Sequence, residues 1–208
     1  GAPLSLRGTT AGCTMEHPIS FFRIWKQRLV KPGCRELRIL SGAAAGIRMM
    51  LDLQRDLQRY LGLYERELHP WVRRFSHGIR TAFDVGAADG EYSLVFLLKT
   101  PAERVFAFEP SAENCRRIAE NLGLNGISPD DPRFSLIGKF AGEKSSDAEC
   151  CLEELRSQVR LPCFVKLDVE GAEAAVLRGC PGLVQQGDVR WLIETHSKEL
   201  EEECATML

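Results

Sequence analysis

Residues 81–99 read TAFDVGAADGEYSLVFLLK, and this stretch decides the fold of the 208-residue chain. The five residues 81–85 are mostly apolar and short in extent, which is typical of a buried strand. Residues 91–99 carry apolar side chains at helical spacing. Gly86 and Gly90 lie in the turn of small residues between the two segments. The stretch therefore predicts a strand, a glycine-containing turn and a helix in succession.

The same alternation continues to the end of the chain. We expect further strands over 104–108, 134–137, 164–169 and 189–193, and helices over 112–124, 151–159, 172–178 and 197–207. Strands that are apolar almost throughout indicate a parallel sheet covered by helices on both faces. The sequence therefore predicts an α/β fold with a doubly wound, mostly parallel sheet. Such sheets bind ligands beyond the carboxyl ends of their strands.

The chain before residue 81 differs in character from the rest. We expect a loose leader over 1–18 and an extension over 19–80 that packs on the domain formed by 81–208. Within the extension, the apolar spacing predicts a helix over 19–30, a strand over 47–53 and a helix over 57–75.

Charge divides along the same boundary. Residues 1–80 hold fourteen Lys and Arg against six Asp and Glu, whereas the remainder holds thirteen against twenty-three. We expect the basic extension to dock on the acidic domain. The alternative is that the basic part reaches an anionic substrate or a membrane surface.

Composition narrows the classes of function. A formal net charge of −2 gives no overall basic surface, which argues against nucleic acid as the main partner. No apolar run approaches the roughly 18 residues that a membrane span requires. The first residues lack the pattern of a secretory signal, so we expect a cytoplasmic protein. The eight cysteines include no C-x-x-C pair, which argues against structural zinc and favours reduced thiols.

The glycine turn is the first candidate binding element. It has the spacing G-x-x-x-G, with Ala87 and Ala88 inside it, rather than the G-x-G-x-x-G of a dinucleotide site. Asp84 precedes the turn, where its carboxylate would repel a pyrophosphate. The turn therefore favours a ligand that has no phosphate and carries a cationic or amine group.

An acidic residue also ends the next predicted strand. Glu109 and Pro110 follow the apolar run 104–108, and Glu109 comes 25 residues after Asp84, which suits one strand–helix–strand unit. A carboxylate at this position can accept hydrogen bonds from both hydroxyl groups of a ribose. The turn and Glu109 together predict a nucleoside site at the edge of the sheet.

Charged side chains occur at the ends of the last two predicted strands. Charges beside an apolar strand are costly to desolvate without partners, which makes Lys166, Asp168 and Glu170 candidates for chemistry. A purely structural alternative is that Lys166 pairs with Asp168 or Glu173 and ties strand to helix. His196 closes the last strand segment and is a candidate proton acceptor.

These runs together resemble a known family. The segments FDVGAADGEYSL, VFAFEPSAENCRRIAENLGLNG, FVKLDVEGAEAAVLRG and WLIETH, with the upstream GLYE, are similar to the FkbM family of S-adenosylmethionine-dependent methyltransferases over about residues 60–200. The resemblance implies a class I methyltransferase fold, S-adenosylmethionine as the cofactor, and O-methylation of a hydroxyl on a small molecule, such as a sugar, lipid or polyketide-type product.

The resemblance also implies roles for the candidate residues. Methyl transfer to a hydroxyl requires removal of its proton, for which we favour His196 as the base, with Asp168 and Glu170 orienting it or the substrate. This assignment uses no metal. In a variant, Asp168, Glu194 and His196 hold a hard divalent cation that acidifies the acceptor. The residues assigned to the cofactor are Asp84, Gly86, Ala87, Ala88, Gly90, Glu109, Pro110, Ser111, Phe140 and Asp168.

The chain departs from the family pattern in two places. Ala88 stands where the family often has asparagine, and the neighbouring Asp89 could substitute for it. Only twelve residues follow His196, where such folds normally continue with two more strands. The chain could be trimmed, the strand predicted over 47–53 could cover a sheet edge, or the sheet could be short.

Two other functions stay open at this point. A nicotinamide-dependent oxidoreductase could use a similar sheet, although the glycine spacing argues against it. A methyltransferase-like module that binds without catalysis is the second alternative, kept open by Ala88 and the short carboxyl terminus. The sequence predicts neither the identity of the acceptor nor the oligomeric state.

Overall fold

A computed structural model describes residues 31–208 of the chain, so the leader predicted over 1–18 and the helix predicted over 19–30 lie outside the described residues. The centre of the structure is a five-stranded sheet in which all neighbouring strands run parallel. Its order is β5-β4-β3-β8-β9, formed by Phe134–Ile137, Arg104–Phe108, Thr81–Val85, Cys163–Leu167 and Val189–Ile193. The predicted parallel, doubly wound α/β fold is confirmed.

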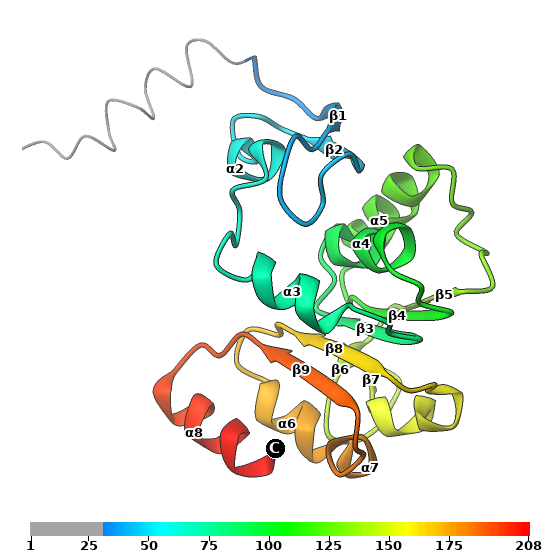
Figure 1. Ribbon diagram of the computed structural model, residues 1–208, viewed down its shortest axis with the longest axis vertical. Coiled ribbons are helices and arrows are strands. Elements are labelled where there is room, and N and C mark those ends of the chain that lie inside the picture. The colour runs from blue at the N-terminus through cyan, green and yellow to red at the C-terminus, as the bar shows by residue number, and fades with distance from the viewer. Residues whose placement is uncertain (1–30) are drawn as a thin grey trace, which may run out of the picture.

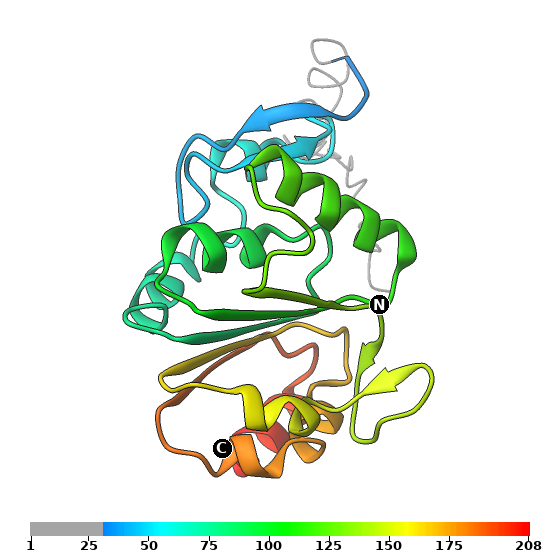
Figure 2. The same cartoon turned by 90° about the vertical axis from the view of Figure 1, so that its right-hand side faces the viewer.

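Helices cover both faces of this sheet (Figures 1 and 2). One face carries α4 and α5 together with the part of the extension that the structure describes. The opposite face carries the helices that follow β5 in the chain. The helices of the domain are α4 (Glu91–Lys99), α5 (Ala112–Leu124), α6 (Glu173–Arg178), α7 (Pro181–Val184) and α8 (Lys198–Met207), with the 3₁₀ segment η1 at Leu152–Gln158.

Two hydrophobic cores form because successive strand residues point to opposite faces of the sheet. In β3, Ala82 packs into the core beneath α4 and α5, whereas its neighbour Phe83 packs into the core beneath α6 and α7. Phe164 belongs to the first core, where its ring lies edge-on to Phe96 at a centroid distance of 5.3 Å. Burial on both faces explains why these strands are apolar along their whole length.

The extension differs from its prediction in two respects. The segment 57–75 is not one helix but two, α2 (Leu57–Leu61) and α3 (His69–Phe75). Gly62 follows α2 in the left-handed conformation, with φ of 70°, and Pro70 lies in the first turn of the next helix. The predicted strand 47–53 is β2 (Arg48–Leu51), paired with an unpredicted β1 (Arg35–Arg38) in a separate antiparallel hairpin.

The hairpin is attached to the domain through Asn121 of α5 and through Asn125, which caps the carboxyl end of that helix. The Oδ1 atom of Asn121 accepts a hydrogen bond from the Met50 backbone N–H at 2.8 Å, and Asn125 accepts one from Arg48 at 3.0 Å. The Nδ2 group of the buried Asn121 donates to the carbonyl of Asp89 in the glycine turn. One side chain therefore joins the hairpin to the candidate binding loop.

The hairpin does not lie on an edge of the main sheet, so the proposed covering of that edge by residues 47–53 is wrong. The described residues contribute five strands to the main sheet, without the two additional strands that the family resemblance led us to expect. A second small pair, β6 (Phe140–Ala141) with β7 (Glu149–Cys150), was also not predicted. In the described part of the chain, no helix is long and apolar enough to cross a membrane.

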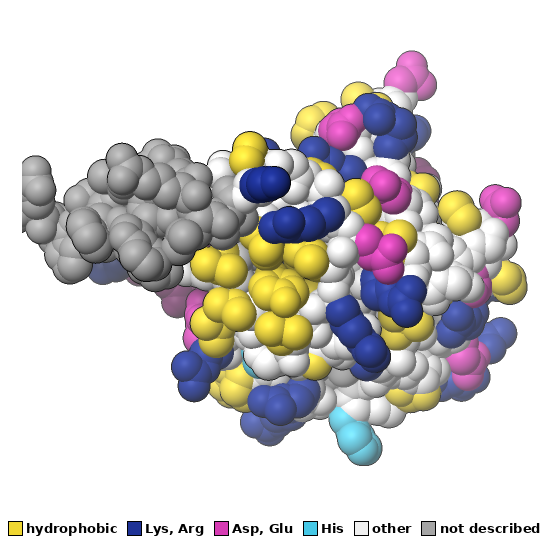
Figure 3. All heavy atoms as spheres, turned by 90° about the horizontal axis from the view of Figure 1, so that it is seen from above, with side chains coloured by type: hydrophobic (Ala, Val, Ile, Leu, Met, Phe, Trp, Pro, Cys, Tyr) yellow, Lys and Arg dark blue, Asp and Glu magenta, His cyan; other side chains and the backbone are white. Residues whose placement is uncertain are grey.

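The basic character of the extension is only partly used in docking. Arg59 pairs with Asp89 and Glu91 of the acidic domain, as the charge pattern predicts. Many other basic side chains stay at the surface. Seen from above, where the hairpin and α2 lie, Lys and Arg side chains border a cluster of hydrophobic ones (Figure 3). The seven cysteines among the described residues are all free thiols, in agreement with the prediction.

Candidate functional site

Three neighbouring cavities follow the carboxyl edge of the sheet, and we call them together the edge groove. The first, of about 350 Å³, lies over the ends of β4 and β8, the second, of about 310 Å³, lies between β3 and α2, and the third, of about 230 Å³, lies beside β9. Gly86, Ala88 and Asp168 line both the first and the second cavity. Lys166 lines both the second and the third. The groove therefore passes the ends of four adjacent strands.

Gly86 is fixed in the groove by its close approach to the neighbouring strand end. Its φ of 83° is left-handed, and a Cβ atom built on it would lie 1.8 Å from the backbone oxygen of Asp168. The backbone N–H groups of Gly86 and Ala87 both donate to the carbonyl of Phe108. Only glycine satisfies this conformation and this contact together. The turn is therefore packed against the segment that follows β8.

Glu109 lies at the end of β4, where the sequence predicted a ligand-binding carboxylate. Glu109 is only 6% exposed, and it lines the first cavity. One carboxylate oxygen accepts from the Ala88 N–H at 2.8 Å, and the other accepts from the Ser111 N–H at 2.9 Å and the Asn114 amide at 3.2 Å. A carboxylate has about four acceptor positions, so capacity for a ligand hydroxyl is left.

The first cavity also contains a large exposed aromatic ring. Phe140 is 59% exposed although it is a phenylalanine, and it lines the cavity together with Pro110. Ser111 is the N-cap of α5, where its Oγ accepts from the Asn114 N–H, and it does not line the cavity. An apolar wall beside a buried carboxylate is suited to a flat ring attached to a polar sugar.

Asp84 and Gly90 lie behind the groove and do not line its three cavities. The carboxylate of Asp84 is buried and accepts from the Ser93 hydroxyl at 2.6 Å, and its second oxygen has no partner among the described residues. Burial raises the pKa of Asp84, and the nearby Lys166 opposes that shift. Gly90 is the N-cap of α4 and has the left-handed conformation. The structure places both residues in support of the loop.

Lys166 and Asp168 form the ion pair that the structural alternative predicted. The Nζ atom of Lys166 lies 3.2 Å from Oδ2 of Asp168 and 4.7 Å from the centre of the Tyr92 ring. The hydroxyl of Tyr92 donates to Glu65 at 2.6 Å. Tyr92 and Glu65 both lie in runs that carry the family resemblance, but sequence reasoning assigned a role to neither. Lys166 and Glu65 line both the second and the third cavity, whereas Asp168 and Tyr92 line the second.

His196 is oriented by Glu173 rather than by the residues first assigned to that task. Its Nδ1 atom lies 2.8 Å from Oε1 of Glu173, whereas its Nε2 atom lies 3.5 Å from Glu170 and 3.8 Å from Asp168. The hydrogen bond that His196 donates to Glu173 raises the pKa of His196, and the charges of Glu173, Glu170 and Asp168 raise it further. Sequence reasoning considered Glu173 only as a candidate partner of Lys166, so it missed this contact with His196.

Asp89 is not free to replace the missing asparagine of the family pattern. Its carboxylate is paired with the guanidinium of Arg59, with Nη1 at 2.6 Å from Oδ2. The Nε group of Arg59 donates to Glu91 at 2.8 Å. The Arg59 side chain is only 18% exposed, so this pair is largely removed from water. Arg59 therefore holds the glycine turn and the first turn of α4 from the side of the extension.

We expect Arg59→Met to lower the free energy of unfolding by about 3 kcal/mol, because it leaves two largely buried carboxylates without their cation. Chemical denaturation measures this change. Arg80→Met is the matched control, since Arg80 pairs with Glu103 at an exposed position and its loss should cost less than about 1 kcal/mol. Equal losses in the two variants would contradict the role assigned to Arg59.

Comparison with known proteins supports the fold. No family model matches the chain, and no curated protein matches it in sequence. Among solved structures, it is similar to the methyltransferase FkbM from Methylobacillus flagellatus KT, with a TM-score of 0.52 and 18% identity. That match covers 81% of this chain and 48% of the other, so the chain spans about half the length of that protein.

Other matches are more distant. The C-terminal domain of precorrin-6Y C5,15-methyltransferase from Rhodobacter capsulatus gives a TM-score of 0.48 at 15% identity, covering 68% of this chain and 67% of that one. An rRNA methylase from Streptococcus thermophilus gives 0.48 at 16% identity, covering 69% and 81%. The five-stranded parallel sheet with helices on both faces is thus the Rossmann-like fold of class I S-adenosylmethionine-dependent methyltransferases.

Proposed function

We propose that the protein transfers a methyl group from S-adenosylmethionine to a hydroxyl of a small molecule. One observation carries the proposal: the turn around Gly86 and the buried carboxylate of Glu109 meet in a cavity with one apolar wall at the carboxyl edge of the sheet. This combination suits a nucleoside without phosphate groups. The donor supplies an electrophilic methyl group on a sulfonium, and the protein supplies position and proton removal.

The residues of the first two cavities fit the donor. The remaining acceptor position of Glu109 suits a ribose hydroxyl, and Phe140 with Pro110 offers an apolar surface for the adenine ring. The second cavity, next to Gly86 and Lys166, suits the amino-acid end of the donor. Lys166 is a cation at this position, which favours a carboxylate there.

The third cavity and the end of β9 suit the acceptor. Leu192 and Ile193 give this cavity an apolar side, and Glu65 and Glu194 give it acceptors for hydroxyl groups. Positioning the acceptor oxygen near the methyl group accounts for a large share of catalysis in such displacements. Glu194, which lines this cavity, lies close to His196, and this proximity supports His196 as the base that removes the acceptor's proton.

Calorimetric titration tests the proposal against its two alternatives. We expect S-adenosylmethionine to bind and NAD to show no heat of binding. Tight binding of NAD would instead favour an oxidoreductase. A labelled-methyl screen of cell extract then separates catalysis from simple binding, because a non-catalytic module would bind the donor and label no product. Mass spectrometry of the natively purified protein for a co-purifying nucleoside gives an independent check.

We expect His196→Ala to lower the turnover number by about 10²–10⁴-fold, since proton removal from a hydroxyl contributes about this much. The affinity for S-adenosylmethionine should stay within about twofold of the wild type, because His196 lies outside the cavities assigned to the donor. His77→Ala is the control, as this exposed histidine lies away from the groove. Equal losses in turnover and donor affinity would contradict the assignment.

A further inference from the structure

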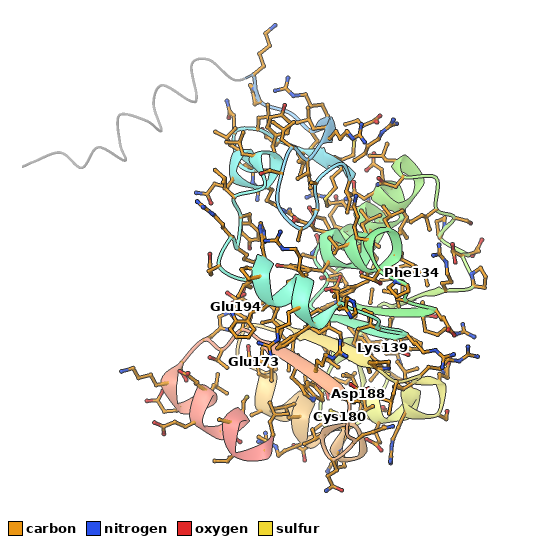
Figure 4. All side chains as sticks on the ribbon, viewed as in Figure 1. Phe134, Lys139, Glu173, Cys180, Asp188 and Glu194 are labelled. Carbon is orange, nitrogen blue, oxygen red and sulfur yellow. The ribbon has the colours of Figure 1, made fainter. Side chains whose placement is uncertain are left out.

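Three potential metal ligands meet where β8 and β9 end side by side. Asp168 follows β8, and Glu194 and His196 follow β9, with Leu167 and Ile193 paired in the parallel register. One ligand atom from each of the three residues lies within 4.8 Å of the other two. Glu194 lies at the carboxyl edge, whereas Asp188, which precedes β9, lies at the opposite end (Figure 4). We call these three residues the strand-end triad.

Each member of the triad has a coordinating atom available. Lys166 pairs with Oδ2 of Asp168, and Oδ1 of the same carboxylate faces His196 at 3.8 Å from Nε2. The carboxylate of Glu194 makes no hydrogen bond or ion pair with any residue that the structure describes. The 3.8 Å distance is too long for a hydrogen bond. It suits two ligands of one cation, which lie roughly 3–4 Å apart when each is about 2.1 Å from the ion.

Glu173 provides a second observation, independent of the triad. Glu173 is fully buried. Its Oε1 atom accepts a hydrogen bond from His196, and its Oε2 atom has no partner among the described residues. A buried carboxylate on Nδ1 fixes the tautomer of a histidine and raises the basicity of its other nitrogen, an arrangement common behind metal-binding histidines. Nε2 of His196 is thereby left facing the carboxylates of Asp168 and Glu170.

The balance of charge around the triad also calls for a cation. Asp168, Glu170, Glu173 and Glu194 lie around the imidazole of His196, and Lys166 is the one Lys or Arg side chain paired with any of them in the described part of the chain. Carboxylates this close together repel one another unless positive charge is added. Glu194 and His196 are exposed, so an ion between them would retain open positions for water or substrate.

We propose that the strand-end triad binds a hard divalent cation, Mg²⁺ or Mn²⁺, which recruits the acceptor hydroxyl. This inference rests on the proposed methyl transfer and deepens it. The hydroxyl oxygen binds the ion, and its proton leaves to solvent because the ion lowers the pKa of the hydroxyl. The oxygen's electron pair then forms the O–CH₃ bond while the S–CH₃ bond breaks and its pair stays on sulfur. His196 acts here as a ligand in place of its predicted role as the base.

Titration of the chelator-treated full chain with Mn²⁺ alone, followed by electron paramagnetic resonance, tests the site directly. We expect saturable binding of one ion per chain. Glu194→Gln and His196→Asn should each weaken that binding at least about tenfold, because each removes one of three protein ligands. Glu67→Gln is the matched control, since Glu67 lines the third cavity but lies outside the triad, and its binding should equal that of the wild type.

The outcomes separate this inference from the proposed function. Absence of saturable Mn²⁺ binding, or equal binding in both triad variants and the wild type, overturns the cation site. Undiminished methyl transfer by the chelator-treated protein overturns it as well and returns His196 to the role of base. If the wild-type protein does not bind S-adenosylmethionine, in contrast, the proposed function is overturned whatever the result with Mn²⁺.

Discussion

Replacement of Gly86 by alanine is expected to abolish binding of S-adenosylmethionine and to lower the free energy of unfolding by at least about 3 kcal/mol. The added methyl group would overlap the backbone oxygen of Asp168, at 1.8 Å, and a backbone atom cannot rotate away as a side chain can. The turn and the end of β8 must therefore move apart. Chemical denaturation and calorimetric titration measure the two effects.

A matched control separates overlap from backbone strain. Gly78 also has a left-handed φ, of 70°, but nothing lies within 4 Å of a Cβ atom built on it. We expect Gly78→Ala to cost only the strain of an L-residue in this conformation, about 1–2 kcal/mol, and to leave donor affinity unchanged. Similar losses of stability in the two variants would show that the contact with Asp168 does not constrain the turn.

Replacement of Glu109 by glutamine is expected to weaken S-adenosylmethionine about 10–100-fold. The charged carboxylate contributes about 1.5–3 kcal/mol to a hydrogen bond with a hydroxyl, and glutamine loses that charge. The backbone N–H groups of Ala88 and Ser111 donate to the two carboxylate oxygens of Glu109. In the glutamine variant, one of these N–H groups would point at the side-chain NH₂ group, which cannot accept a hydrogen bond. Titration calorimetry on protein shown by circular dichroism to be folded measures the loss.

Glu113→Gln is the control for this variant. Glu113 lies one turn away on α5, is exposed, and pairs with Arg116 and Arg117 on its own helix. Its replacement should leave donor affinity unchanged, since exposed pairs of this kind contribute little. A folded Glu109→Gln protein that binds the donor as tightly as the wild type would remove the basis for placing the nucleoside at the end of β4.

The strands of the domain could be predicted from sequence because burial on both faces leaves an unambiguous apolar run. Residues 81–85, 104–108 and 189–193 form strands with the predicted bounds, and the helix 91–99 is likewise confirmed. The helices of the extension were harder to predict from sequence. The helical spacing of apolar residues over 57–75 continues across Gly62, whose left-handed φ ends the helix. The pattern of apolar residues does not record where the backbone must reverse.

The candidate site could be predicted in its positions but not in its pairings. The glycine turn, Glu109, Asp168 and the end of β9 come together at one edge because parallel strands end on the same side. The partners of these residues depend on side-chain geometry between segments far apart in the chain. The contacts of Arg59 with Asp89 and of Glu173 with His196 span 30 and 23 residues, and no local pattern indicates them.

Arg59 and Asn121 both bind the glycine turn, so the extension helps to hold that turn in its conformation. A shortened chain that starts at Thr81 would keep Asp89 and Glu91 while discarding the guanidinium that neutralises them. A chimera that combines the extension of one related chain with the domain of another would keep this contact only if it had both Arg59 and Asp89. We therefore expect these two positions to covary among related sequences, because a substitution at only one of them leaves the other charge largely buried and without this partner.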